Sequence, residues 1–204
     1  VGKDIGIAPG AALYYFATPS WITDNIYRTE ALKTIIELNK SPLIKEKIRV
    51  VSISHGRFKS SKNYGKWDEA LKQADAAGIL VITCDPSTID FGTLTRSPFS
   101  DPALPESYVP ESWDDTPHPI WVPGGGRSHA SYKGETVYTF EITSGKSWST
   151  PYLAGVAALG YQLNPELSPM RVKELLIKSA APTKAGAVIS PKGFIELIRE
   201  TMDK

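Results

Sequence analysis

The chain has 204 residues, of which 41% are hydrophobic and 22% charged, and its formal net charge at pH 7 is +1. These values are typical of a globular protein that builds its own hydrophobic core. The charge balance gives no support for a nucleic-acid or membrane partner, no apolar run approaches the ~20 residues of a spanning helix, and a single cysteine, Cys84, excludes an intrachain disulfide.

In the first half of the chain, short apolar runs alternate with amphipathic stretches of helical spacing. The predicted elements are a buried strand Ala11–Ala17, a helix Ile26–Leu38, a strand Ile48–Ser54, a helix Trp67–Ala77 and a strand Ile79–Thr83. The last of these is continuously apolar, which is typical of a parallel strand covered on both faces.

The second half begins with Asp85–Pro119, which carries seven prolines, has little periodicity and is predicted to be a long loop. After it come a strand Ile120–Val122, a glycine turn at Gly124–Gly126, a helix from Ser147 to Leu163, and helices starting at Ser168-Pro169 and at Pro191. Strands alternating with helices predict a doubly wound α/β fold, with residues 1–204 in one domain.

The segment Gly145–Gly155 carries the strongest chemical signal. A glycine is followed by Ser147 and then by a helix with Pro151 in its first turn, so that a hydroxyl lies at a helix N-terminus. The free N–H groups and the helix dipole there favour negative charge, as a serine nucleophile requires. A serine that only caps the helix is the alternative.

This segment resembles the active-site serine motif of subtilisin-like serine peptidases, G-T-S-M-A-[ST]-P-H-V-A-G. Similar family segments are found in order at Val1–Tyr14, Val50–Gly56, Ala70–Ile82 and Trp121–Gly124. The resemblance implies a three-layer α/β sandwich with a mostly parallel sheet, and a serine endopeptidase that cleaves polypeptides with Ser147 as nucleophile. It implies no cofactor.

In the family, the catalytic aspartate and histidine precede the segment that resembles Val1–Tyr14. We therefore expect both partners upstream of residue 1, and a fold that lacks its first strand and the histidine-bearing helix. The 204-residue chain alone is then expected to be inactive, because a serine without a base is a weak nucleophile. The alternative is a catalytically inactive homologue that serves as a peptide-binding or regulatory module.

The resemblance also implies the other site residues. Ser54, His55 and Gly56 correspond to the strand end that binds the extended substrate. The family's oxyanion-hole asparagine falls near Ser87, so the donor is either the Ser87 hydroxyl or a protonated Asp85. Of the three histidines, His55 is a minor candidate for the base, whereas His118 and His129 are predicted to be loop residues. Their spacing does not match a metal site.

Overall fold

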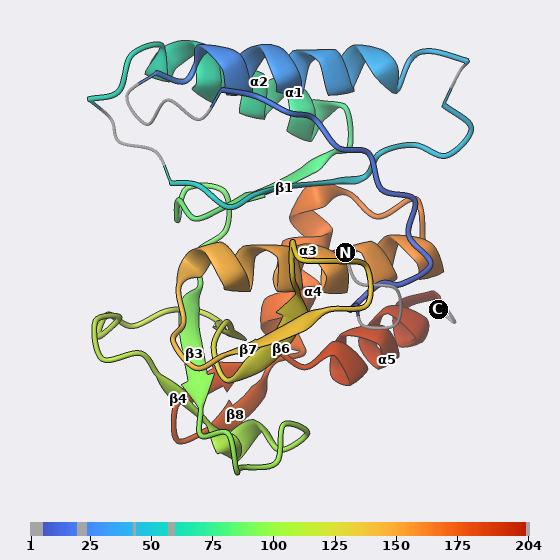
Figure 1. The fold of residues 1–204 in the computed structure, drawn as a ribbon. Helices are drawn as coiled ribbons and strands as arrows, with labels where there is room; N and C mark the ends of the chain where they lie inside the picture. Colours follow the sequence, from blue (N-terminus) through green and yellow to red (C-terminus); the bar gives the residue numbers. More distant parts are fainter. Residues whose placement is uncertain (1–5, 20–23, 43, 57–59, 203–204) are drawn as a thin grey trace.

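The computed structural model describes residues 6–19, 24–42, 44–56 and 60–202, and within them the chain forms three layers. Helices α1 (Ile26–Leu38) and α2 (Tyr64–Ala76) lie side by side over one face of the parallel strands β1 (Val50–Ile53) and β2 (Leu80–Thr83). The long helix α3 (Lys146–Leu163) lies on the opposite face, as Figure 1 shows.

Strand β2 explains why helices cover both faces. All four of its residues are buried, and successive side chains of a strand point to opposite faces. Val81 packs in the cluster formed by α1 and α2, whereas Leu80 and Ile82 pack in the larger cluster that contains α3. The predicted parallel strand with two buried faces is therefore confirmed.

A five-stranded sheet continues the fold beyond β2. Its strand order is β4 (Tyr108–Pro110), β3 (Gly92–Arg96), β5 (Trp121–Pro123), β9 (Gly186–Val188) and β8 (Ala181–Thr183). The three central strands pair in parallel, and the edge strands β4 and β8 pair antiparallel. The mostly parallel α/β fold class predicted from the sequence is thus confirmed at the centre of the structure.

The remaining elements surround α3. Helices α4 (Pro169–Lys178) and α5 (Pro191–Met202) contribute to the same core cluster as α3, and β6 (Arg127–Ala130) pairs with β7 (Tyr138–Glu141) in an antiparallel hairpin. Ser168 caps α4 as expected, since its side chain accepts a hydrogen bond from the Arg171 N–H. Within the described residues, no helix has both the length and the apolar character that membrane crossing requires.

Three of the sequence predictions are wrong. Ala11–Ala17 is not a buried strand: it has no strand assignment, and Leu13 and Tyr15 are 72% and 87% exposed. A strand needs a neighbour to receive its backbone hydrogen bonds, and the described chain pairs none with this segment. Residues 85–119 contain β3, β4 and a short 3-10 helix η1 (Pro105–Ser107), and His129 lies on β6 rather than in a loop. Residues 1–5, where the segment resembling the family begins, lie outside the described residues.

The small residues of α3 allow close contacts, although these are not only with the sheet. Ala154 and Ala157 are buried in the core cluster. At Gly160, an added Cβ would lie 2.6 Å from the Phe194 ring of α5, and at Gly155 it would lie 2.8 Å from Ile7. The two glycines therefore accommodate a neighbouring helix and the N-terminal segment.

Candidate active site

Ser147 lies at the N-terminus of α3, close to where the sequence places it. Gly145 is the N-cap, and its carbonyl accepts the N–H groups of Trp148 and Ser149. Ser147 is therefore the second residue of the helix, where backbone N–H groups have no intrahelical partner. Those N–H groups and the positive end of the helix dipole surround the serine. This is an environment in which developing negative charge is stabilised.

The Ser147 side chain faces the carboxyl ends of β1 and β2. Its Oγ donates to the Ser54 carbonyl at 3.4 Å, and the Ser54 hydroxyl donates to the Ser147 carbonyl at 2.7 Å. Cys84, which directly follows β2, places its Sγ 3.8 Å from the Ser147 Oγ. Two residues predicted for the site, 93 positions apart, are thus in contact at the edge of the sheet where α/β proteins bind ligands.

A buried hydroxyl network holds the start of α3 against the sheet. Ser149 is fully buried, donates to the Val122 carbonyl of β5 at 3.0 Å and lies 2.7 Å from the Thr93 hydroxyl of β3. Thr93 also bonds Ser144 at 2.6 Å. A Cβ at Gly124 would lie 2.3 Å from the Ser144 Oγ, so the glycine run lets the strand end approach this network.

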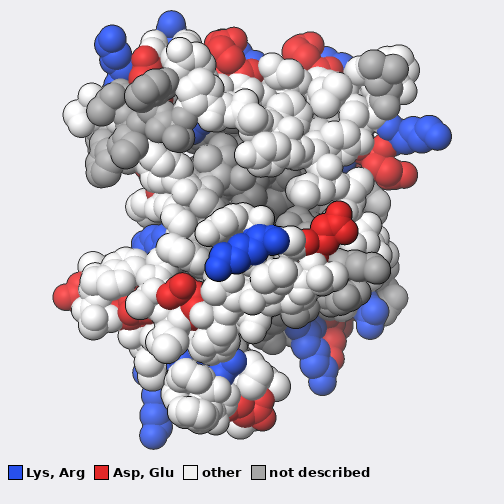
Figure 2. Space-filling model, viewed as in Figure 1, with Lys and Arg blue, Asp and Glu red and all other residues white. Residues whose placement is uncertain are grey.

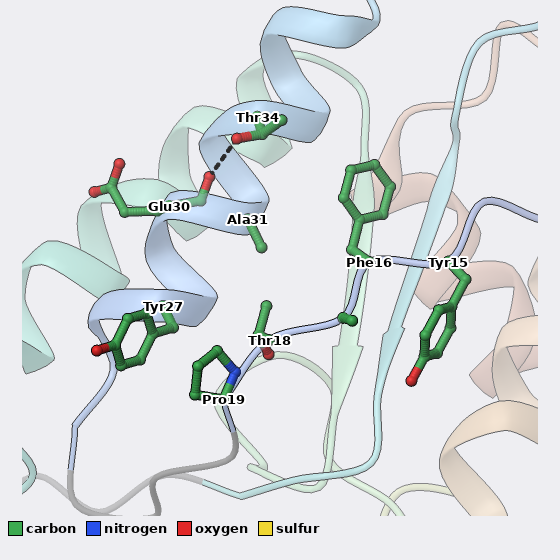
Figure 3. A pocket seen from close by; sticks show the side chains of 9 residues that line it. Tyr15, Phe16, Thr18, Pro19, Tyr27, Glu30, Ala31 and Thr34 are labelled. Carbon is green, nitrogen blue, oxygen red and sulfur yellow. Dashed lines mark hydrogen bonds between the residues drawn. The ribbon is translucent and has the colours of Figure 1, made fainter.

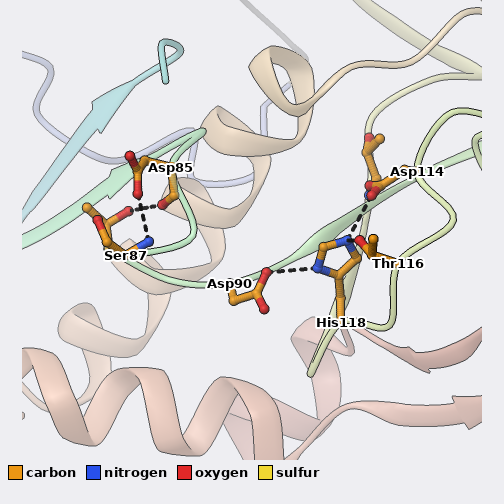
Figure 4. A network of polar contacts seen from close by, with 8 residues as sticks. Asp85, Ser87, Asp90, Asp114, Thr116 and His118 are labelled. Carbon is orange, nitrogen blue, oxygen red and sulfur yellow. Dashed lines mark hydrogen bonds and ion pairs between the residues drawn. The ribbon is translucent and has the colours of Figure 1, made fainter. Parts of the chain in front are cut away.

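The turn after β2 is stabilised by its own side chains. The Ser87 N–H donates to the Asp85 carboxylate at 2.8 Å (Figure 4), and the Asp85 N–H donates to the Thr83 hydroxyl at 3.0 Å. Ser87 also lines a groove of about 390 Å³ together with Asp75 of α2 and Lys173 of α4. Sequence reasoning missed Cys84, whose position directly after a buried parallel strand was the available signal.

The segment predicted to bind substrate continues past β1. The His55 carbonyl accepts the Cys84 N–H at 3.2 Å, and the Gly56 carbonyl accepts from Arg28 Nη1 at 3.2 Å. Burial, and after it the charge of Arg28, lower the pKa of the His55 imidazole, so this ring is neutral at pH 7. Arg28 of α1 is a second residue that the sequence did not reveal, because its contact to Gly56 spans 28 positions.

His118 occupies a separate polar cluster, also shown in Figure 4. Its Nδ1 lies 2.8 Å from the Asp90 carboxylate and its Nε2 2.8 Å from that of Asp114. Asp114 also accepts the N–H of Thr93, and the His118 ring packs edge-on against Trp121 at 5.1 Å. Although His118 is in a loop as predicted, it is buried, and it ties that loop to β3 and β5. The only feature of the sequence that indicated this contact was the four-residue spacing of Asp114 and His118.

A second groove lies away from the candidate site. Figure 3 shows a groove of about 410 Å³ between residues 15–19 and α1, lined mainly by aromatic and small side chains, with Glu30 at its rim. None of the predicted site residues lines it. Among the described residues, no group of three or more His, Cys, Asp or Glu side chains is arranged to hold a metal ion. Acidic and basic side chains are interspersed over the face in Figure 2.

Comparison with known sequences points to one family. The model of the subtilase family, peptidase family S8, matches residues 107–194, a range that includes Ser147. The subtilisin-like protease SBT2.6 of Arabidopsis thaliana is 27% identical over 150 residues, which is 72% of this chain. The same alignment covers only 17% of that protein, so the chain spans less than a fifth of its curated relative.

Solved structures of subtilases have the same fold. The prenylagaramide maturation protease PagA superposes with a TM-score of 0.68 and 18% identity, over 95% of this chain and 76% of that one. A structure of the subtilase cytotoxin SubAB assembly gives a TM-score of 0.67 and 16% identity, over 96% and 74% of the two chains. The patellamide maturation protease PatA gives 0.58 and 18%, over 86% and 69%. At these identities the likeness concerns the fold.

Proposed function

Because residues 107–194 match the subtilase family model and the chain is similar to a subtilisin-like protease, we propose that it supplies the serine nucleophile and the substrate-binding edge of a serine endopeptidase. The observation that supports this most directly is the position of Ser147. Its hydroxyl is at the positive end of α3 and touches Ser54, the residue that begins the proposed substrate-binding segment Ser54–Gly56.

In the proposed reaction, the Ser147 Oγ attacks the carbonyl carbon of the scissile peptide bond while a general base removes its proton. The negative charge that develops on the carbonyl oxygen is stabilised by the Ser147 N–H and the dipole of α3. The second donor comes from the turn after β2, as the Ser87 hydroxyl or a protonated Asp85 carboxyl. An aspartate donates only when it carries a proton, and Asp85 now accepts the Ser87 N–H.

The base and its orienting carboxylate are proposed to come from a part of the protein upstream of residue 1. His118 is held by Asp90 and Asp114, and His129 lies on the β6–β7 hairpin. His55 is neutral and next in sequence to Ser54, but its ring has no hydrogen bond to Ser147 among the described residues. The substrate polypeptide would bind as an added strand along Ser54, His55 and Gly56.

A fluorophosphonate probe tests the proposal, because it phosphonylates an activated serine with loss of fluoride. We expect labelling of a version of the protein extended upstream, and Ser147→Ala should abolish both labelling and cleavage of a peptide substrate. We expect the 204-residue chain alone to show neither, because loss of the base leaves only the ~10³–10⁴-fold residual acceleration of binding and the oxyanion hole.

Ser128→Ala is the matched control, since Ser128 is an exposed serine of β6. This variant should label and cleave like the wild type. Labelling that survives Ser147→Ala would assign the nucleophile to another residue. An extended protein that binds peptides without labelling or cleavage would instead be a peptide-binding homologue without catalytic activity.

A further inference from the structure

We infer that Arg28 and His55 form an anion-binding subsite that selects an acidic side chain in a polypeptide bound along Ser54–Gly56. The inference rests on the proposed function, because it adds a chemical preference to the same substrate-binding edge. It concerns which substrates bind rather than how the bond is cut.

Arg28 reaches from the first turn of α1 to the end of the substrate-binding segment. One arm of its guanidinium, Nη1, donates to the Gly56 carbonyl at 3.2 Å. The other arm, Nη2, is buried and has no hydrogen-bond partner in the part of the chain that the structure describes. A guanidinium presents donors in a rigid fork, so fixing one arm orients the other.

His55 adds a second unpaired group beside the first. Its Nε2 is buried and likewise lacks a hydrogen-bond partner among the described residues. His55 directly precedes Gly56, whose carbonyl accepts from Arg28, and the charge of Arg28 contributes to lowering the pKa of His55. Buried polar atoms without partners are uncommon and costly, so two of them at a binding edge indicate a ligand group that satisfies both, with the neutral imidazole as its Nε2–H tautomer so that both atoms donate.

The charge of Arg28 specifies that this ligand group is an anion. Burial lowers the pKa of the Arg28 guanidinium, but a guanidinium in a protein keeps its charge at pH 7. Asp24 is the anion that acts on it through space, and the Asp24 carboxylate already accepts from the Asn63 side chain and the Ile26 N–H. A carboxylate supplied by the substrate would therefore gain charge-assisted hydrogen bonds.

The register along the segment places the selected side chain away from the scissile bond. Ser54 is bonded to Ser147, and Gly56 follows two residues later. At 3.3 Å per residue, Gly56 lies about 7 Å further along an extended chain. We expect the acidic side chain about two to four residues from the bond that is cut.

Fluorescence anisotropy with labelled nine-residue peptides tests this subsite. The protein used is the Ser147→Ala variant, so that no peptide is cleaved. The peptides are compared in pairs that differ at one position, where one peptide carries Glu and the other its neutral isostere Gln, and the pairs together cover the nine positions. At one position, Glu should bind about tenfold more tightly than Gln, which corresponds to about 1.4 kcal/mol. The difference should shrink at about 1 M salt, where the Debye length is ~3 Å.

Substitution of Arg28 assigns the effect to this residue. Arg28→Gln should remove the preference for Glu, and Arg28→Lys should keep part of it, because the charge remains while the fork is lost. Arg171→Gln is the matched control: Arg171 is an exposed residue of α4 that pairs with Glu174, and this variant should keep the full preference. Should Arg28→Gln fail to fold, Arg28→Lys and the salt dependence of the wild-type preference remain as readouts.

The subsite and the proposed function fail in different ways. Equal binding of Glu and Gln at every position, or a preference that survives in a folded Arg28→Gln variant, would overturn the subsite. A Glu preference that depends on Arg28, in a protein whose extended form shows no Ser147-dependent labelling, would support the subsite and reject the peptidase activity.

Discussion

Tyr161 is a buried tyrosine of α3 whose hydroxyl is unusually hard to ionise. Its side chain is 5% exposed, and the guanidinium of Arg49 lies over its ring at 4.7 Å from the centroid. Burial raises the pKa of Tyr161 to about 12, although the positive charge of Arg49 partly opposes the effect. Arg49 also donates to the Leu167 carbonyl, which fixes it over the ring.

The first prediction is that Tyr161 makes the protein less stable at alkaline pH. An unfolded tyrosine ionises near pH 10, whereas the folded protein keeps this proton until about pH 12. Between these values the unfolded state binds fewer protons, so the free energy of unfolding falls as the pH rises. Absorbance near 295 nm should show a late tyrosine step in the native protein that Tyr161→Phe reduces, while part of it remains because burial also raises the pKa of Tyr152.

Tyr132→Phe serves as the control for this titration, because the Tyr132 side chain is 96% exposed. This variant should retain the late step. The prediction is wrong if the native protein lacks that step, or if Tyr161→Phe leaves the alkaline loss of stability unchanged. The buried Tyr161 hydroxyl would then not be the cause of that loss.

At the level of single residues, the sequence predicted positions better than contacts. Ser147 was predicted from a local pattern, a glycine followed by a hydroxyl and a helix, and such a pattern is determined within a few residues. Its contact with Cys84 depends on the fold, as does the bond between Arg28 and Gly56. Local sequence patterns do not predict which buried polar groups will form hydrogen bonds with each other.

Gly160 marks the contact between α3 and α5. An added Cβ would lie 2.6 Å from two Phe194 ring atoms and 3.1 Å from the Ile198 side chain. Both neighbours are fully buried, so they have little room to move. We predict that Gly160→Ala lowers the free energy of unfolding by about 1–2 kcal/mol, because overpacking outweighs the gain in helix propensity of ~1 kcal/mol.

Gly65→Ala in α2 is the matched control for this substitution. There an added Cβ meets no heavy atom within 4 Å, so the change should leave stability unchanged or raise it by up to about 1 kcal/mol. Urea unfolding of both variants measures the difference. A Gly160→Ala protein as stable as Gly65→Ala would mean that α3 and α5 do not approach as closely as described.

Helices were predicted well and short strands poorly, for a physical reason. Helix α1 spans the residues predicted for it, and α4 begins at its predicted Ser-Pro start, because period and caps are local signals. Strands β3 and β4 have five and three residues and lie in a proline-rich stretch. Their existence depends on pairing with each other and with β5, which the sequence of either strand does not specify.

At the scale of the whole molecule, two hydrophobic clusters are divided by β2. One cluster joins α1 and α2 to one face of the strand, and the other joins α3, α4 and α5 to the opposite face. Ser147 lies at the end of this strand, with Cys84 next to it, and Arg28 of α1 donates to the Gly56 carbonyl beyond the end of β1. The candidate site is thus built where the helical layers meet the carboxyl edge of the sheet.

The division into layers was predictable, whereas the exposed N-terminal segment was not. A fully apolar run such as Ile79–Thr83 indicates burial on both faces. The equally apolar Ala11–Ala17 predicted the same, but the structure leaves the segment exposed except at Phe16, which is partly buried against the α1–α2 cluster. Hydrophobicity predicts that a segment favours burial, but the partner that buries it must be present in the fold.

The last prediction concerns the acid side of the stability profile and rests on His55. Burial, and then the charge of Arg28, lower the pKa of this imidazole below its ordinary value of about 6.5. Above that value the ring is neutral in both the folded and the unfolded chain. As the pH falls below it, the unfolded chain takes up a proton first, so the free energy of unfolding decreases until the folded pKa is passed.

His55→Gln should therefore flatten the stability profile just below pH ~6.5 and leave it parallel to the wild type above about pH 7.5. Urea unfolding across this range measures the two slopes. Asp24 acts in a separate window: its hydrogen bond with the Asn63 side chain, followed by that with the Ile26 N–H, lowers its pKa, so its contribution is lost only below about pH 3.9. If the stability of His55→Gln has the wild-type slope just below pH ~6.5, the folded protein accommodates the charged imidazole. Arg28 and His55 then do not share the buried setting described for them.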